Sequence, residues 1–125
     1  MSGERDLSTL LATLSVDRHD GVWAFASHAE APATSAVMLF KEREGWTTIA
    51  PATPDTPADN RWVWLELSVY SDLQAVGFLA AVSAALAEAG VPCNAVAAFH
   101  HDHIFVPEAL AETAEAAILA LKDPA

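Results

Sequence analysis

The most regular pattern in the chain is the alternation of apolar residues over residues 61–70, which predicts a strand with two distinct faces. The aliphatic residues that share the first face are Val63, Leu65, Leu67 and Val69. The second face carries Trp62 and Trp64 at its N-terminal end. A sheet with helices on one side usually leaves its other side polar. We therefore expect this aromatic face to be covered, either by the N-terminal half of the chain or by a second subunit.

Apolar residues at helical spacing predict three helices. A series of leucines predicts the first over residues 6–14. A broad apolar stripe predicts the second over Leu73–Ala89, with Ser71-Asp72 as its cap and Gly90 at its end. The third begins at Pro107-Glu108, where both residues suit a helix N-terminus.

Shorter apolar segments, separated by turn residues, predict the other strands. These strands cover residues 21–27, 36–41, 46–50, 93–99 and 103–106. Residues 17–21 and 100–102 are predicted to be turns, and Glu44-Gly45 closes a hairpin. The prolines of the segment Pro51–Asn60 allow no more than a single turn there, so this segment marks the internal boundary of the chain.

The second half of the chain therefore has the order β-α-β-β-α. This order is typical of ferredoxin-like α+β sandwiches, in which an antiparallel sheet carries helices on one face. The first half has the order α-β-β-β, which supplies edge strands to a second small lobe of the same type. We predict two lobes, residues 1–58 and residues 59–125, whose antiparallel sheets pair with each other or across subunits.

Acidic residues outnumber basic ones by 17 to 6 among 125 residues, which gives a formal net charge of −11. Nucleic acid and anionic membrane surfaces bind clustered Lys and Arg, and the basic residues here are scattered, so the charge excludes both partners. Residues 1–6 hold no apolar signal-peptide core. The longest uncharged apolar run, residues 73–87, is shorter than the ~18–20 residues that span a bilayer. We therefore expect a cytoplasmic protein.

The reactive side chains form no recognisable catalytic arrangement. The serines lie in no nucleophile-elbow motif, and the chain has no phosphate-binding loop of the P-loop or Rossmann type. We therefore predict no catalytic residue, no cofactor and no enzymatic activity; the alternative is an enzyme that uses His101 or His103 as a general base. Cys93 is the one cysteine, which excludes an intramolecular disulfide and suits a small buried apolar residue.

The string His100-His101-Asp102-His103 carries the residue types that bind zinc or nickel. Neighbours on a tight hairpin point to opposite faces, so the four side chains do not converge easily. His101 and His103 would share a face, and a second subunit would add further ligands. The other interpretation is a polar β-turn that Asp102 satisfies. Divalent metal binding through this turn is therefore kept as the alternative function.

A set of short motifs lies between residues 69 and 94. They are the strand end Val69-Tyr70-Ser71, the loop Asp72-Leu73, the pair Val76-Gly77, the helix end Leu86-Ala87-Glu88-Ala89-Gly90-Val91, and Asn94. This set resembles the ACT domain, a small regulatory module that binds amino acids. The longer string CNAVAAFHHDHIFVP is similar to bacterial stand-alone proteins with paired ACT-like lobes. The resemblance covers residues 61–121 and extends more weakly to the N-terminal half, which implies ACT-like lobes over 1–58 and 59–125.

The resemblance implies a non-catalytic sensor that binds an amino acid or a similar small metabolite at a lobe or subunit interface. The ligand-binding residues that it implies are Tyr70, Ser71, Asp72, Val76, Gly77 and Asn94. Free backbone amides near residues 75–77 would bind the ligand carboxylate, and Asp72 and Asn94 would bind its ammonium. We expect the loop before the helix and the start of the next strand to lie at the same edge of the lobe.

Each of these residues also has a purely structural interpretation. Asp72 would cap a helix, Gly77 would allow close helix packing, and Asn94 would hydrogen-bond its own turn. A plain interaction module without a ligand is a further class. Because the chain is small and places Trp62 and Trp64 on the helix-free face, we also expect a homodimer.

Overall fold

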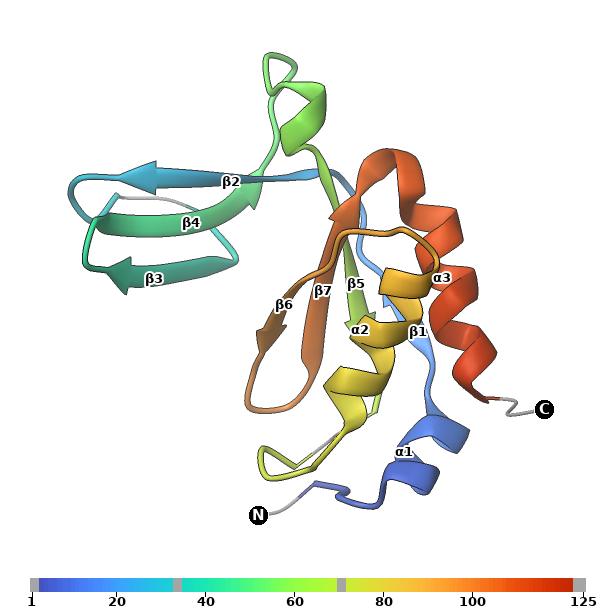
Figure 1. Ribbon diagram of the computed structural model, residues 1–125. Coiled ribbons are helices and arrows are strands. Elements are labelled where there is room, and N and C mark those ends of the chain that lie inside the picture. The colour runs from blue at the N-terminus through green and yellow to red at the C-terminus, as the bar shows by residue number, and fades with distance from the viewer. Residues whose placement is uncertain (1–2, 33–34, 70–71, 123–125) are drawn as a thin grey trace.

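The computed structural model describes residues 3–32, 35–69 and 72–122, which form an antiparallel sheet with helices on one of its faces (Figure 1). The strands are β1 (Val16–Arg18), β2 (Trp23–His28), β3 (Met38–Glu42), β4 (Gly45–Pro51), β5 (Trp62–Leu67), β6 (Asn94–Ala97) and β7 (Asp102–Pro107). The α-helices are α1 (Leu7–Thr13), α2 (Phe78–Glu88) and α3 (Ala111–Leu119). Single 3-10 turns lie at Ala58–Asn60, Glu108–Leu110 and Ala120–Lys122. The prediction of an α+β protein with an antiparallel sheet is confirmed.

Strand β5 organises the sheet, whose strand order is β3-β4-β2-β5-β7-β6. On one side β5 pairs with β7 along its whole length, from Trp62 opposite Pro107 to Leu67 opposite Asp102. On the other side β2 reaches β5 at Trp62, and β1 pairs with the opposite end of β5, where Val16 lies opposite Leu67. The first half of the chain therefore contributes to the sheet of the second half.

Strand β1 was not predicted from the sequence, because residues 17–21 were expected to form a turn. Strand β1 has three residues and two of them, Asp17 and Arg18, are charged, so it shows no apolar alternation. Helix α1 lies beside it, and Leu10 and Leu14 are buried in the same core as β5. The division of the chain at residues 58 and 59 stays a prediction, and α1 and β1 pack across it.

The alternation of β5 is confirmed by burial. Val63, Leu65 and Leu67 are at most 1% exposed and lie beneath the helices. The other large residues of this core are Leu10, Leu14, Phe78, Val82, Leu86, Ile104, Val106 and Ile118. This core is aliphatic except for Phe78, and it holds the three α-helices against one face of the sheet.

Helix α2 begins at Phe78, five residues later than the predicted start at Leu73. Gly77 is its N-cap residue, with a φ of 91°, a left-handed conformation that glycine adopts readily and that interrupts a helix. Leu73 and Val76 are 65% and 83% exposed, so their apolar spacing does not reflect a buried helix face. The predicted cap at Asp72 is wrong for the same reason: its carboxylate accepts a hydrogen bond from Gln74 N at 2.8 Å, which closes a turn ahead of the helix.

The helix-free face of the sheet carries a second, aromatic layer. Trp62 and Trp64 are half-buried there, and the N-terminal half supplies part of their cover, one of the two predicted possibilities. Phe25 packs edge-on against Trp62, and Trp23 packs edge-on against Trp64, with ring centroids 5.5 Å and 5.2 Å apart. Figure 1 shows β2, β3 and β4 extending away from the helices as an arm.

Within the three described ranges, every helix is too short or too polar to cross a lipid bilayer.

Candidate functional site

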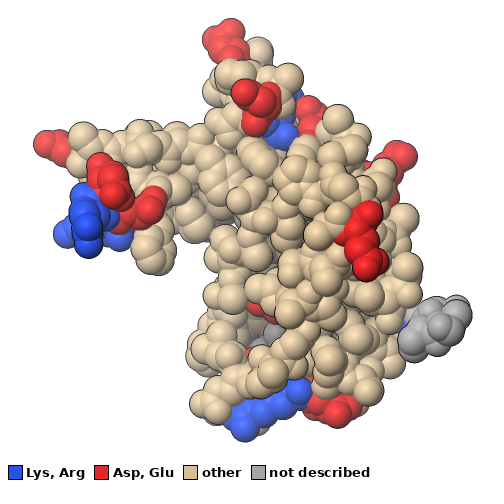
Figure 2. Space-filling view, viewed as in Figure 1, with Lys and Arg blue, Asp and Glu red and all other residues tan. Residues whose placement is uncertain are grey.

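A pocket of about 190 Å³ lies where α2 begins. It is lined by Asp72, Leu73, Ala75, Phe78, Leu79, Ala97, Ala98 and Asp102. These residues come from the loop after β5, the first turn of α2, the end of β6 and the start of β7. Figure 2 shows the surface hollowed near the start of α2, with acidic atoms visible inside the hollow.

The N-terminus of α2 supplies hydrogen-bond donors to this pocket. The first backbone N–H groups of any α-helix lack partners inside the helix, and Gly77 has no side chain to cap them. Phe78 and Leu79, which open the helix, line the pocket. A carboxylate is the group that such a helix start binds best, because the exposed amides and the helix dipole both favour negative charge.

The predicted donors lay slightly earlier in the chain, near residues 75–77. Ala75 N already donates to the backbone oxygen of Asp72 at 2.9 Å, so this amide is not free. The helix itself begins later than the predicted donors, at Phe78. A Cβ added to Gly77 would lie 3.5 Å from Leu7 Cδ2, an ordinary contact, so the left-handed φ is what favours glycine here.

Asp72 brings negative charge to the same pocket. The Gln74 N–H and, after it, the Arg5 guanidinium hold the pKa of this carboxyl below its usual value. Arg5 Nε lies 3.2 Å from Asp72 Oδ1, and the Arg5 side chain is 58% exposed. Asp72 is therefore ionised at neutral pH, and its cationic partner is a side chain that is more than half exposed to solvent.

Asp102 is the second carboxylate of the pocket and is 8% exposed. It lies opposite Leu67 on one side and Ala97 on the other. From sequence Asp102 was expected to be either one of the metal ligands of the His100–His103 string or the residue that satisfies a polar turn, and Ala97 and Ala98 were not predicted as pocket residues. No pattern marks an acidic residue of a polar string as buried, because burial here depends on how the hairpin packs against α2.

Only some of the predicted site residues lie at this pocket. Asp72 lines the pocket and Gly77 immediately precedes the pocket residue Phe78, whereas Val76 is 83% exposed outside the pocket lining. Tyr70 and Ser71 lie outside the described residues. Asn94 is at the far end of β6 from Ala97, a distance of about 10 Å at the usual rise per strand residue.

The expectation that Asn94 shares an edge with the loop is therefore wrong within one chain. Helix α2 runs back along the sheet, so β6 starts at the end of the sheet opposite that loop (Figure 1). Asn94 pairs with Phe105, and the end of β6 at Ala97 returns to the pocket. The prediction placed the start of β6 at this edge, whereas the end of β6 lies there.

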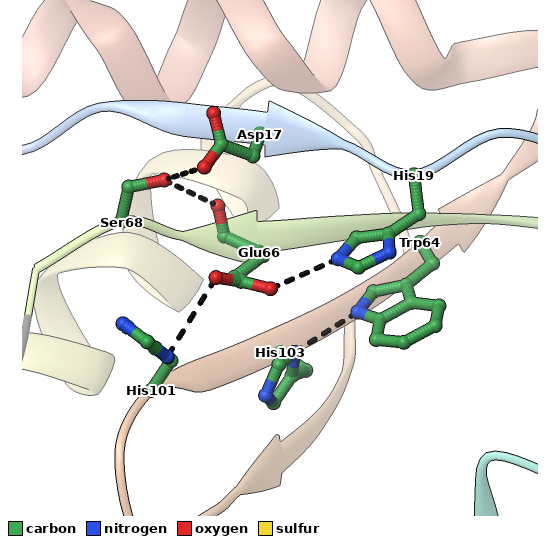
Figure 3. Close-up of polar contacts among 7 residues, drawn as sticks. All are labelled: Asp17, His19, Trp64, Glu66, Ser68, His101 and His103. Carbon is green, nitrogen blue, oxygen red and sulfur yellow. Dashed lines mark hydrogen bonds and ion pairs between the residues drawn. The ribbon is translucent and has the colours of Figure 1, made fainter.

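A polar cluster occupies the helix-free face (Figure 3). Glu66 lies between two imidazoles, with Oε1 2.9 Å from His19 Nε2 and Oε2 3.6 Å from His101 Nδ1. His103 lies directly opposite Glu66 in the sheet, and Ser68 donates a hydrogen bond to Asp17 at 2.6 Å. Burial lowers the pKa of His103. In residues 3–32, 35–69 and 72–122, no set of three or more His, Cys, Asp or Glu side chains is arranged to hold a metal ion, which does not support the metal alternative.

Comparisons with known proteins identify relatives of the whole chain. Residues 2–59 and residues 61–120 each match a family model of the ACT domain. A crystal structure from Vibrio cholerae, of a protein of unknown function described as a possible transport protein, is similar at 29% identity. Its TM-score is 0.81, and the match covers 94% of this chain and 96% of that chain. A crystal structure from Agrobacterium tumefaciens shares the fold at 18% identity and a TM-score of 0.67, covering 87% of this chain and 89% of that one. The curated proteins include no match to this chain.

Proposed function

The chain belongs to the ACT-domain family, and from this premise we propose that it is a non-catalytic regulatory module that binds an amino acid or a similar small metabolite. The proposed site is the pocket at the start of α2. The two matched segments are the tandem ACT-like lobes of this module. It acts in the cytoplasm as a homodimer.

The observation that supports this proposal is the pairing of opposite charge preferences in one pocket. A free amino acid carries a carboxylate and an ammonium group a few bonds apart. The helix start at Phe78 favours the carboxylate, and the carboxylates of Asp72 and Asp102 favour the ammonium. The volume of about 190 Å³ is below the ~300–1,000 Å³ of pockets that hold drug-sized molecules, which favours a small metabolite.

A second copy of the chain brings Asn94 to the same site. Among the described strands, β6 pairs with β7 only, and its residues Asn94–Ala97 include no charge and no proline. Edge strands without such protection pair readily with other chains. If two β6 strands pair antiparallel about a twofold axis, the start of one lies beside the end of the other. Asn94 of the second copy then approaches Ala97 and the pocket.

The first test is a thermal-shift screen of the full chain against the amino acids. A ligand at a hundred times its Kd stabilises the folded state by about 2.7 kcal/mol. Asp72→Asn should abolish most of the shift, because it removes the charge that binds the ammonium. Asp55→Asn removes the same charge from an exposed loop and should leave the shift intact. A screen without any shift, or equal shifts in wild type and Asp72→Asn, would reject the site.

The second test asks whether the site is shared between subunits. Asn94→Ala should weaken binding by about 1–3 kcal/mol, because a polar group of the ligand loses its partner. Asp72→Asn and Asn94→Ala are then mixed and allowed to exchange subunits. Each mixed dimer contains one site with both substitutions and one intact site, so the mixture should regain binding that neither variant has. A mixture that stays as weak as its components would confine the site to one chain.

A further inference from the structure

A second pocket, of about 120 Å³, opens on the helix-free face of the sheet. One wall is formed by Val37, which precedes β3, and by Met38, the first residue of β3. Val96 on β6, Ala98 after it and Phe105 on β7 form the opposite walls. Strands β3 and β6 are the two edges of the sheet, so the sheet curls until both of its edges border one opening. Ala98 also borders the pocket at α2, from the other side.

The imidazole of His103 lines this second pocket, and its hydrogen bond to Trp64 defines its tautomer. The indole Nε1–H of Trp64 donates to His103 Nδ1 at 2.9 Å, and an indole nitrogen is only ever a donor. Nδ1 is therefore unprotonated, and the neutral ring carries its proton on Nε2. Burial lowers the pKa of His103, which keeps the ring neutral at physiological pH. Within the part of the chain that the structure describes, Nε2 has no hydrogen-bond partner, and Figure 3 shows it turned away from Trp64.

This donor is held in place before any ligand arrives. The ring of His19 stacks parallel to the Trp64 indole, with ring centroids 3.5 Å apart. Trp23 and Phe105 contact the same indole at 5.2 Å and 5.9 Å between centroids. Since Trp64 is fixed on several sides, the imidazole that accepts from it is fixed as well. The binding of a ligand to such a preorganised donor costs little side-chain entropy.

We propose that this pocket is a second binding site, for a small neutral molecule with an apolar body and one carbonyl or hydroxyl oxygen. The oxygen accepts the hydrogen bond of His103 Nε2, and the body contacts the apolar walls. The volume is close to the ~150 Å³ of an apolar protein cavity that binds benzene. The residues of the pocket wall include no Lys, Arg, Asp or Glu that would pair with an ionic ligand of either sign, which favours a neutral molecule.

The test is a titration of the full-length, ¹⁵N-labelled protein with cyclohexanone, followed by NMR. We expect saturable shifts of the Trp64 indole N–H and of the Val96 amide. Cyclohexanecarboxylate has a similar body with a negative charge and should bind more weakly. Shifts that rise linearly without saturation, or carboxylate binding as tight as ketone binding, would overturn the proposal. Shifts of the Trp64 indole N–H on dilution of the protein alone would place a second copy in the opening and would also overturn the proposal, whereas a dilution shift confined to the Val96 amide is expected from the proposed β6 pairing.

Two variants at exposed positions of the arm separate the pocket from general effects. Val37 is 43% exposed, so Val37→Phe is accommodated by the fold while its ring fills the pocket. It should weaken cyclohexanone binding by at least about tenfold, because the added ring takes up the space that the ligand would occupy. Leu39→Phe is the matched control, since Leu39 is 46% exposed and lies outside the pocket lining. Equal losses in both variants, or no loss in either, would reject the pocket.

The hydrogen bond is tested separately. His103→Phe keeps a ring of similar size without the donor and should weaken binding about three- to tenfold, the usual contribution of one hydrogen bond. Val37→Phe should leave the amino-acid thermal shift of the α2 pocket unchanged, so failure of one site is distinguishable from failure of the other. Unchanged cyclohexanone affinity in a folded His103→Phe variant would remove His103 from the site.

Discussion

On one face of β5, Val63, Leu65 and Leu67 are fully buried beneath the helices, whereas on the other face Trp62, Trp64 and Glu66 keep part of their surface exposed. The aliphatic face has no polar atoms to satisfy. On the aromatic face the indole nitrogens have hydrogen-bond partners: Trp62 Nε1 donates to Asn60 Oδ1 at 3.1 Å, and Trp64 Nε1 donates to His103 Nδ1. Burying polar atoms stabilises a protein only when they are paired.

The two faces of β5 contribute to the protein in different ways. The aliphatic face supplies stability through area removed from water, which is insensitive to pH. The aromatic face supplies stability through paired rings, and it leaves room for a pocket and an imidazole donor. One indole on this face differs from Trp62 and Trp64: Trp23 Nε1 is buried without a hydrogen-bond partner among the described residues. Changes to the two faces should therefore differ in size and in kind.

The largest effect is expected from the aliphatic face. Leu65 is fully buried between the sheet and the helices. Leu65→Ala should lower the free energy of unfolding by about 2–5 kcal/mol, because it leaves a cavity in the core. Urea denaturation followed by circular dichroism measures the loss. A cost below that of Trp64→Phe would contradict the assignment of the main core to this face.

A smaller effect is expected from the aromatic face. Trp64→Phe keeps an aromatic ring but removes the hydrogen bond to His103 Nδ1. The expected loss is about 1 kcal/mol, the net contribution of one hydrogen bond. Urea denaturation of Trp64→Phe and of Trp46→Phe, a tryptophan of the arm, provides the comparison. Equal losses in both variants would mean that the pairing with His103 contributes nothing specific.

The aromatic face should also make stability depend on pH. Because burial lowers the pKa of His103 below the ordinary 6.5, the unfolded chain takes up a proton at a higher pH than the folded chain does. The contribution of His103 to stability is therefore complete above about pH 7 and falls as the pH drops through 6.5 toward the folded value. Denaturation of wild type and His103→Phe at several pH values measures the difference. The variant should lose less stability on acidification, and a steeper loss would reverse the sign.

The smallest effect concerns Cys93, which packs beside the aliphatic core. Burial raises the pKa of its thiol, so little thiolate is present at neutral pH. Alkylation by iodoacetamide should be slower in the folded protein than in the protein unfolded by urea. Equal rates would show that the helix side is open to solvent at this position.

The sequence predicted those elements whose pattern reflects burial in their own segment. The alternation over residues 61–70 predicted β5 and its two faces because each side chain there meets one environment along the whole strand. The start of α2 was misplaced because Leu73 and Val76 have helical spacing but are exposed, and one left-handed glycine decides where the helix begins. Strand β1 is held by a partner far along the chain, and nothing within its own three residues records that partner.

The site was predicted in part, for a similar reason. Asp72 and the helix start are neighbours in sequence, so local reasoning brought them together. Asp102 and Ala97 reach the pocket only because α2 reverses the chain direction before β6. The placement of Asn94 failed on that reversal. Whether Asp72, Gly77 and Asn94 bind a ligand stays a prediction, which the ligand screen and the subunit-exchange experiment would test.

Strand β1 also determines how the chain can be cut. It lies near the start of the sequence, yet it pairs with β5, which follows the entire arm and the proline-rich segment. Joining such distant segments costs loop-closure entropy, so this pair should form after the local hairpins during folding. A break within residues 52–57 places β1 and β5 on different fragments, each lacking a strand that the other holds. Circular dichroism should show poorly folded fragments when they are apart and a native-like spectrum when they are mixed. The chain would then be divisible by a protease without being divisible into two independent proteins.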